Sequence, residues 1–358
     1  WRLPPDAAGS GEEPVQSDAR WQWRENQDLV AALSPDAQRI AVGDVEGQVH
    51  IFSAASPPAI DDEPLGYLGH STAVSHLVFS GDGALVASVG GSGTIRIWDS
   101  ATGVPRRFQA ALPTDLVTRL RFSAGGRYLA ALLGSQVWIL NAESGDVVVN
   151  MDLGEPHADL AFHNDEELYL ASSSGMLKRL SADRFGQWLA DDIWQSPQGL
   201  SRISIASTRG LMVLIDARNR AQVFDITAGS IGTARLQLVD NVSDVLFNTR
   251  ESQVLLRTAR WVHRADVSGS GIRWRNAVRA PQSLSGSEMV FDTARQQSPV
   301  PGSTRREENK VLLLTRDNGF AQIAELDFAH RRGSLTSGDR TELLEEWGDK
   351  LSSEFVDR

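Results

Sequence analysis

The chain has 358 residues, no cysteine and a formal net charge of -11 at pH 7. This length can bury a core without staples, and the lack of cysteine excludes disulfides, thiolate metal sites and cysteine nucleophiles. The negative charge argues against nucleic-acid or anionic-membrane binding, and no apolar run approaches the roughly 20 residues of a membrane-spanning helix.

Two features bear on the origin of the chain. Only Lys178, Lys310 and Lys350 are lysines among the 35 basic residues, a bias that favours a GC-rich bacterial genome. The first residue is Trp1 instead of methionine, so we expect a chain that was processed or cut from something longer. A cytoplasmic and a periplasmic or other extramembrane location both stay open.

The N-terminal segment contains a tail and then a strand. Residues 1–18 are rich in proline, glycine and glutamate, and this composition predicts an irregular tail. The sequence Arg-Trp-Gln-Trp-Arg at 20–24 alternates between polar and aromatic residues, which predicts a β-strand.

A short strand that ends in an apolar residue followed by a small or acidic one recurs seven times. The copies lie at 49–53, 95–99, 137–141, 177–181, 221–225, 262–266 and 322–327. From Phe52 onward the steps are 46, 42, 40, 44, 41 and 61 residues, and a repeat of about 40–45 residues is typical of a four-stranded unit. The last step is longer because a polar stretch at 293–308, which includes two prolines, reads as an inserted loop.

The second repeat shows the strand order of one unit. It predicts strands at 74–80, 84–89, 94–99 and 106–110, with tight turns at 81–83 and 90–93. The same order fits residues 29–53 and 116–150. Helical periodicity is missing until the C-terminus.

This second repeat resembles a well-formed WD repeat. The resemblance is carried by Gly69-His70, by residues 78–83 and by Gly-Thr-Ile-Arg-Ile-Trp-Asp at 93–99, with the Gly-His and Trp-Asp pairs at the family's usual separation. The other repeats keep the strand skeleton, so the resemblance covers about 20–328 at falling quality. It implies an all-β, seven-bladed β-propeller of four-stranded antiparallel blades over residues 19–328.

The second repeat departs from the WD pattern at one place. Gly91-Ser92-Gly93 stands where such repeats usually carry an aspartate. The resemblance then implies that the buried hydrogen-bond set of His70, Ser88 and Trp98 is incomplete, and we expect a softer blade.

A closed ring of blades requires a contact between the first and the last blade. The last repeat offers strands at 287–292, 310–315 and 320–327 but no obvious fourth strand. Propellers often close when an N-terminal strand completes the last blade, because closure removes the exposed sheet edges. We therefore predict that the strand at 20–24 is the fourth strand of the last blade.

The C-terminal segment, 329–358, is predicted to hold a short amphipathic helix. It begins at Ser337 or Asp339 and presents Leu343, Leu344, Trp347 and Leu351 on one face. This helix either packs on the ring or leads into another domain.

Signals for catalytic or metal chemistry are weak. No two of the seven histidines have the spacing of a helical metal site. The loop Gly90–Gly93 precedes a strand instead of a helix, so it reads as a hairpin turn and not as a phosphate cradle. The sequence boxes of sialidase-like and quinoprotein propellers are also missing. We predict no catalytic residue, no metal and no cofactor, and hence no enzyme.

One stretch of the acidic chain is locally basic. It includes Arg257 to Arg264 around Trp261, and then Arg273, Trp274 and Arg275. Arginine beside tryptophan can meet an acidic protein patch. The alternative is a solvated blade face, on which strand alternation packs Trp274 and exposes the two arginines.

The leading functional hypothesis is a monomeric ring that serves as a non-catalytic protein-protein interaction scaffold. We expect its contacts on loops around one rim, with the basic strand as a competing surface. One alternative is the sensory or extramembrane ligand-binding module of a membrane-associated or signalling protein, and another is a propeller hydrolase with acids that converge on a central channel. The candidate rim residues are Asp44, Glu46, Asp115, His157, Arg218, Arg260 and Asp317.

Overall fold

The computed structural model describes most of the repeat region. The described residues are 19–22, 30–36, 38–53, 69–113, 117–227, 230–231, 236–237, 241–247, 251–258, 261–268, 271–279, 288–291, 310–317 and 320–327. Within these ranges all regular structure is β, apart from one 3-10 turn at Ser207–Arg209. The predicted tail 1–18, the inserted loop 293–308 and the helix at 337–351 lie outside the described residues.

The described strands form seven antiparallel sheets, most of them four-stranded. The first three sheets contain β2 (Val30–Leu33), β3 (Arg39–Gly43) and β4 (Val49–Ser53); β5 (Val74–Phe79), β6 (Leu85–Gly90), β7 (Thr94–Asp99) and β8 (Pro105–Ala111); and β9 (Arg119–Phe122), β10 (Tyr128–Leu133), β11 (Gln136–Asn141) and β12 (Val147–Asp152). The strands predicted for the second repeat are confirmed to within two residues at each end.

The remaining four sheets continue the same order along the chain. They contain β13 (His157–Asn164), β14 (Glu167–Ser172), β15 (Met176–Ala182) and β16 (Trp188–Gln195); β17 (Leu200–Ala206), β18 (Leu211–Asp216), β19 (Ala221–Thr227), β20 (Ser230–Ile231) and β21 (Leu236–Gln237); β22 (Asp244–Phe247), β23 (Gln253–Arg257), β24 (Trp261–Ser268) and β25 (Gly271–Arg279); and β26 (Glu288–Phe291), β27 (Lys310–Asp317) and β28 (Phe320–Asp327). Each of the seven recurring segments found in the sequence lies on the third strand of its sheet.

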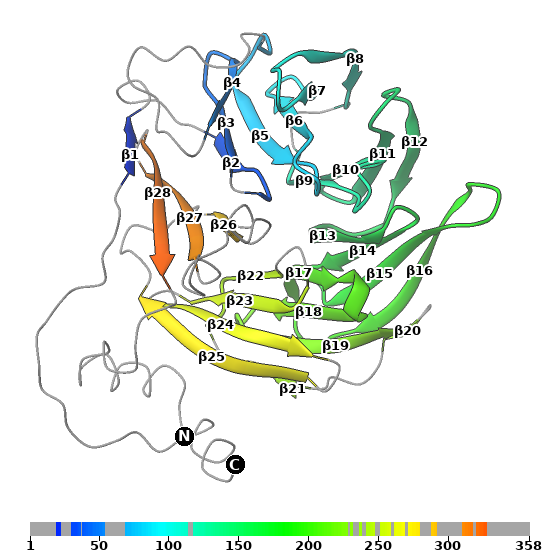
Figure 1. Ribbon diagram of the computed structural model, residues 1–358. Coiled ribbons are helices and arrows are strands. Elements are labelled where there is room, and N and C mark those ends of the chain that lie inside the picture. Colours follow the sequence, from blue (N-terminus) through cyan, green and yellow to red (C-terminus); the bar gives the residue numbers. More distant parts are fainter. Residues whose placement is uncertain are drawn as a thin grey trace, which may run out of the picture.

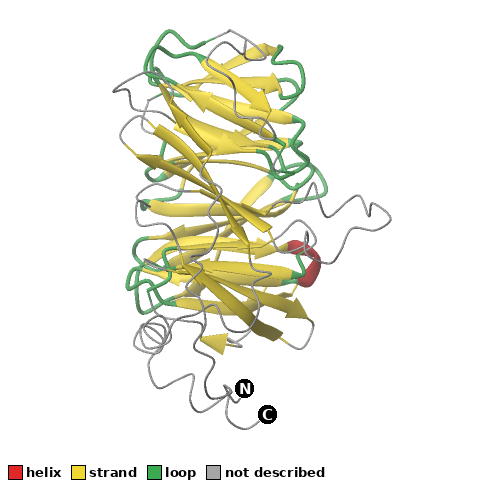
Figure 2. Ribbon diagram, turned by 60° about the vertical axis from the view of Figure 1, so that its left-hand side comes forward, coloured by secondary structure: helices red, strands yellow, loops and turns green. Residues whose placement is uncertain are grey.

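The sheets are arranged around a common axis (Figure 1). The first strand of one sheet lies against the first strand of the next, in the order β2, β5, β9, β13, β17 and β22. β2 also lies against β26 and β27, which belong to the last sheet. In Figure 2 the strands cross the middle of the molecule and the loops gather on its two sides.

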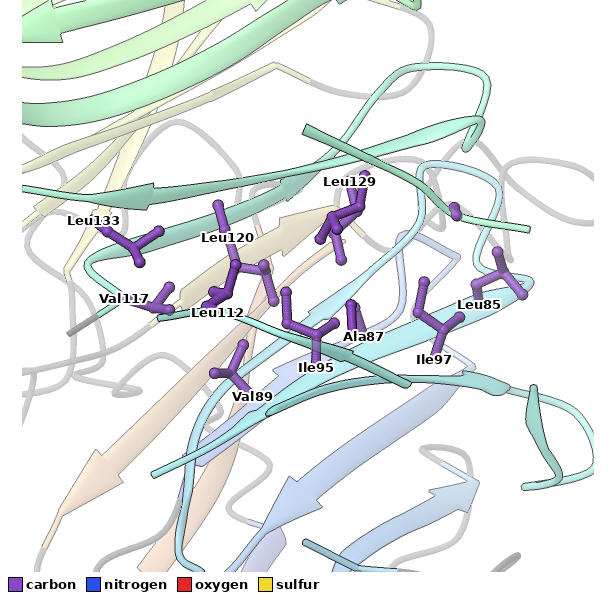
Figure 3. Packing of buried hydrophobic residues seen from close by; sticks show 14 residues of the cluster. Leu85, Ala87, Val89, Ile95, Ile97, Leu112, Val117, Leu120, Leu129 and Leu133 are labelled. Atoms are coloured by element: carbon purple, nitrogen blue, oxygen red, sulfur yellow. The ribbon is translucent and has the colours of Figure 1, made fainter. Parts of the chain in front are cut away.

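The core lies between neighbouring sheets. Every residue of β6, β10 and β18 is buried, because each of these second strands is covered on both faces by other sheets. Figure 3 shows the cluster between the second and third sheets, where Ile95 and Ile97 pack toward Leu120 and Leu129. Full burial of one such side chain contributes about 1.5–3 kcal/mol, so a ladder of these contacts holds each pair of sheets together.

The N-terminal strand lies in the sheet formed by the end of the chain. β1 (Ala19–Gln22) pairs antiparallel with β28, with Ala19 opposite Ile323 and Gln22 opposite Phe320. The predicted pairing of the N-terminal strand with the last sheet is therefore present for residues 19–22, and Trp23 and Arg24 of the predicted strand lie outside the described residues. The pairing joins segments about 300 residues apart in the sequence.

The hydrogen-bond set of the second sheet is partly formed. The Trp98 Nε1–H group donates to Ser88 Oγ at 2.8 Å, and His70 Nε2 lies 2.7 Å from the same oxygen. His70 Nδ1 is buried and has no hydrogen-bond partner among the described residues. Burial, with a smaller effect of the Arg96 charge, lowers the pKa of His70 to about 4. The set thus lacks an acceptor for His70, as the missing aspartate implied.

Among the residues that the structure describes, no helix is long and apolar enough to cross a membrane.

Candidate functional site

Four of the first strands, β5, β9, β17 and β22, share one polar feature at the end where they begin. The hydroxyl groups of four residues each donate a hydrogen bond to a second-strand carbonyl 14 positions later, at 3.1–3.3 Å: Ser75 to Val89, Thr118 to Leu132, Ser201 to Ile215 and Ser243 to Arg257. These bonds fix the start of the four strands in the same way. The next residue therefore occupies an equivalent position in these four sheets.

That position carries a charged or titratable residue in five consecutive sheets. His76, Arg119, Asp159, Arg202 and Asp244 lie opposite Val89, Leu132, Ala171, Ile215 and Arg257 on the respective second strands. The pairing register shifts immediately before His76, Asp159 and Arg202. Such β-bulges redirect a side chain, and they are common beside functional sites.

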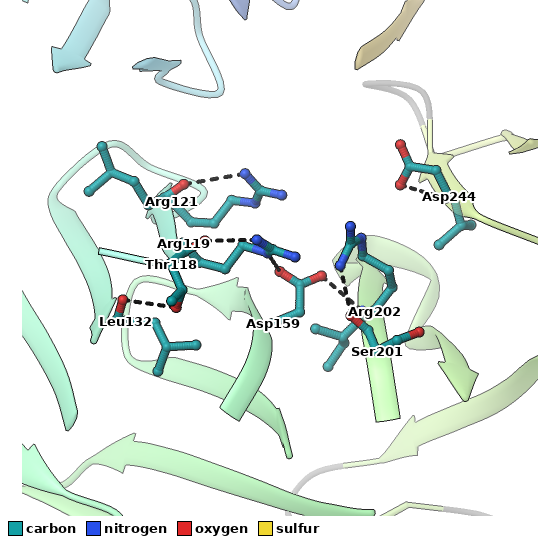
Figure 4. A network of polar contacts seen from close by, with 11 residues as sticks. Thr118, Arg119, Arg121, Leu132, Asp159, Ser201, Arg202 and Asp244 are labelled. Carbon is teal, nitrogen blue, oxygen red and sulfur yellow. Dashed lines mark hydrogen bonds and ion pairs between the residues drawn. The ribbon is translucent and has the colours of Figure 1, made fainter. Parts of the chain in front are cut away.

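Five of the inward-pointing side chains form what we call the axial cluster: Arg119, Arg121, Asp159, Arg202 and Asp244. They come from β9, β13, β17 and β22 and point toward one common region (Figure 4). On β26, Glu288 has the equivalent position by register, opposite Leu314. Its side chain lies outside the part of the structure that is described.

Asp159 is the buried centre of the axial cluster. It is 1% exposed, and its Oδ1 atom accepts a hydrogen bond from Arg119 Nε at 3.1 Å. Its Oδ2 atom accepts from the backbone N–H of Ile203, on the neighbouring sheet, at 3.2 Å. Asp159 therefore links three consecutive sheets through β9, β13 and β17.

The arginines of the cluster are oriented by backbone carbonyls. Arg119, Arg121 and Arg202 each donate an Nη1–H to the carbonyl of the preceding residue, at 2.7, 3.3 and 3.0 Å. Arg121 is exposed and Arg202 is half-buried, so solvent reaches both guanidinium groups. The cluster is thus a set of oriented cations that stays accessible.

The charges of the cluster influence one another. Burial lowers the pKa of Arg119, Asp159 raises it, and Arg202 and Arg121 lower it further. Burial raises the pKa of Asp244, and this effect outweighs the hydrogen bond from Val245 N–H and the charges of Arg202 and Arg121. Ionised Asp244 therefore costs folding free energy despite its basic neighbours.

This raised pKa makes a prediction for stability against pH. Because the folded state holds the Asp244 proton more tightly than the unfolded state, ionised Asp244 destabilises the fold above its pKa, and the cost disappears as the pH falls through it. We expect Asp244→Asn to raise the urea midpoint at pH 7.5, with a smaller gain at pH 4.

The control for this experiment is an aspartate with the opposite shift. The Thr102 hydroxyl, which donates to Asp99 Oδ1 at 2.8 Å, lowers the pKa of Asp99. Asp99→Asn should therefore lower the urea midpoint at pH 7.5, with a smaller loss at pH 4. If Asp244→Asn raised the urea midpoint more at pH 4 than at pH 7.5, this result would contradict a raised pKa of Asp244.

Two predicted rim residues are buried and need correction. Asp44 is 1% exposed, accepts a hydrogen bond from Gln48 N–H at 2.8 Å and lies 3.6 Å from His50 Nε2. His157 is 4% exposed, and its Nδ1–H group donates to the Glu155 carbonyl at 2.8 Å. Burial lowers the pKa of His157. Both side chains form hydrogen bonds with the backbone of their own turns, so they are not available to a partner on the surface.

The other predicted residues fall into three groups. Glu46 and Arg218 are exposed, in the turns between β3 and β4 and between β18 and β19. Asp317 ends β27 opposite Phe320, and Arg273, Trp274 and Arg275 lie on β25, the outer strand of its sheet; their side chains lie outside the described set. Asp115 and Arg260 lie outside the described residues altogether.

The axial cluster was missed in the sequence, although a signal for it exists. The tetrapeptides Val-Ser-His-Leu at 74–77, Val-Thr-Arg-Leu at 117–120, His-Ala-Asp-Leu at 157–160, Leu-Ser-Arg-Ile at 200–203 and Val-Ser-Asp-Val at 242–245 place a charged or titratable residue third. The repeat is most regular at the end of the third strand, where the seven recurring segments lie. The charged or titratable side chains of the cluster come instead from the third residue of the tetrapeptide, which varies between sheets.

Metal ligands do not gather in the described part of the chain. No group of three or more histidine, aspartate or glutamate side chains among those residues could hold a metal ion. The axial cluster itself is dominated by guanidinium groups, which bind anions and repel metal cations.

Comparison with known proteins agrees with the geometry. Residues 62–99 match the family described as "WD domain, G-beta repeat". No curated protein sequence matches the chain. Among solved structures, the chain is similar to the β-propeller domain of Cps50 (Swd1) from Myceliophteria thermophila, with 12% identity and a TM-score of 0.62 over 87% of this chain and 100% of that one.

These comparisons identify a WD repeat in the second sheet and a β-propeller fold for the chain. Propellers of the WD type typically act as platforms for protein-protein interaction, because their sheets carry the core and their loops are free to vary. The match to the WD family lies on the same repeat whose Gly-His and Trp-Asp pairs resemble that family in the sequence.

Proposed function

We propose that this protein is a non-catalytic interaction scaffold, built as a seven-bladed propeller over residues 19–328 and closed by β1. Closure is supported by the pairing of β1 with β28 and by the contact of β2 with β26 and β27. Each of the seven sheets is then one blade, and the first strands surround the axis.

The axial cluster is the observation that carries the proposed function. It gathers three arginines on the inner strands of a chain whose net charge is -11. A basic site in an acidic protein concentrates electrostatic attraction at one place, and this steers an acidic partner to that place. Exposed Glu46 and Arg218 are candidate contacts at the rim, and β25 with Arg273 and Arg275 is the competing surface.

The test compares three baits in extracts of the native host. They are the unchanged protein, an axial variant with Arg121→Gln and Arg202→Gln, and an outer-strand variant with Arg273→Glu and Arg275→Glu. We expect the unchanged protein and the outer-strand variant to capture the same protein, measured by quantitative mass spectrometry, and the axial variant to lose most of it. Three baits that capture only what empty resin captures would refute the scaffold proposal.

A further inference from the structure

We infer that the axial cluster binds a single carboxylate group, presented by an acidic segment of a protein partner, through the guanidinium groups of Arg121 and Arg202. This inference rests on the proposed function and names the chemistry of the ligand. It follows from the unused donors of the two arginines, from the charge balance of the cluster and from the orientation of the side chains.

Arg121 and Arg202 keep most of their hydrogen-bonding capacity. A guanidinium group has five N–H donors, and each of these two uses one for the carbonyl of the preceding residue. Among the described side chains, the ion pair of Asp159 is with Arg119, and no carboxylate lies within ion-pair distance of Arg121 or Arg202. A planar fork of free donors matches the two oxygens of a carboxylate.

The charge balance favours a monoanion over a dianion. The cluster contains three arginines and two aspartates, Asp159 and Asp244. These five residues carry one excess positive charge when all are ionised. One carboxylate neutralises these five residues, whereas a phosphate dianion would add a second negative charge beside two aspartates.

The cluster is oriented before a ligand arrives. Asp159 holds Arg119 and, through the Ile203 N–H group, the strand that carries Arg202. The bonds of Arg121 and Arg202 to their backbone carbonyls restrict their rotamers. The arginine side chains therefore lose less conformational entropy when a partner's carboxylate binds, and this raises the affinity.

Binding can be measured on the whole protein with defined probes. The probes are sodium acetate, sodium sulfate, and a terminally blocked pentapeptide with one glutamate between glycines, together with its glutamine counterpart. The readout is the set of arginine Nε–H signals of the ¹⁵N-labelled protein, titrated at constant ionic strength and pH 7. We expect acetate and the glutamate peptide to shift the Arg121 and Arg202 signals, with the glutamine peptide and sulfate at least about tenfold weaker.

Variants of the axial cluster should change the affinity for the glutamate peptide in opposite directions. Arg202→Gln should weaken binding of the glutamate peptide about tenfold, and Arg202→Lys should weaken it as well, since an ammonium group lacks the fork. Asp244→Asn removes a negative charge near the ligand and should tighten binding roughly threefold. Unchanged spectra of the remaining backbone amides would show that each variant is folded.

Several outcomes overturn the inference. They are equal binding of the glutamate and glutamine peptides, tighter binding of sulfate than of acetate, and unchanged affinity in Arg202→Gln. Binding of acetate without binding of the peptide would assign the site to a free small carboxylate and reject the protein segment. A partner that the axial variant still captures would sink the inference and leave the scaffold proposal standing.

Discussion

Replacing Asp159 by alanine is expected to lower the free energy of unfolding by about 3 kcal/mol, because it breaks a largely buried ion pair by removing one partner. Asp159 is 1% exposed and Arg119 keeps 27% of its side chain exposed, so the loss lies at the lower end of the usual range for such pairs. The variant leaves the Arg119 guanidinium beside two other arginines and the Ile203 N–H group without its acceptor. Urea denaturation followed by tryptophan fluorescence measures the difference.

Two matched variants separate the causes of this loss. Asp159→Asn keeps an oxygen for Ile203 N–H and removes the charge, so it should retain part of the stability. Asp192→Ala removes a carboxylate from an exposed pair with Lys178 and should change the free energy of unfolding by no more than about 0.5 kcal/mol. Equal effects of Asp159→Ala and Asp192→Ala would show that the axial pair has no special role in the fold.

Gly47→Ala is expected to be at least as damaging, with a loss of about 4 kcal/mol. Gly47 has a φ of +88°, and a Cβ atom there would lie 2.3 Å from the His70 carbonyl oxygen and 2.5 Å from that of Thr72. The Gly47 carbonyl also accepts a hydrogen bond from His70 N–H at 2.6 Å, where the first sheet meets the entry to the second. A side chain would therefore force two neighbouring sheets apart.

The control is a glycine that also has a positive φ but has free space where a Cβ atom would lie. Gly134, in the turn between β10 and β11, has a φ of +61° and no atom within 4 Å of a Cβ built on it. Gly134→Ala should cost only the left-handed conformation, about 1 kcal/mol. Thermal and urea unfolding of the two variants measure the difference. If both lose the same amount, backbone strain alone explains Gly47 and the steric argument fails.

The strands of this protein could be predicted from the sequence because they depend on local patterns. β6 and β10 are short apolar runs between glycine-rich turns, and the period near 43 residues made each copy support the others. The pairing of β1 with β28 was predicted from a missing strand, since an unpaired sheet edge is costly. The rim residues were predicted less well, because a turn position in the sequence does not say which way its side chain points. Asp44 and His157 turned inward to satisfy buried polar groups of their own turns.

The sequence by itself determined the repeat, the all-β class and the WD character of one unit, since these follow from periodicity and turn chemistry within about 45 residues. Only the tertiary structure decided which charged residues meet. Arg119, Asp159, Arg202 and Asp244 are 40 to 43 residues apart along the chain, and each looks like an isolated charge on its own strand. They become one cluster because the sheets are arranged around a common axis, so that the same register position of neighbouring sheets faces the same region of space.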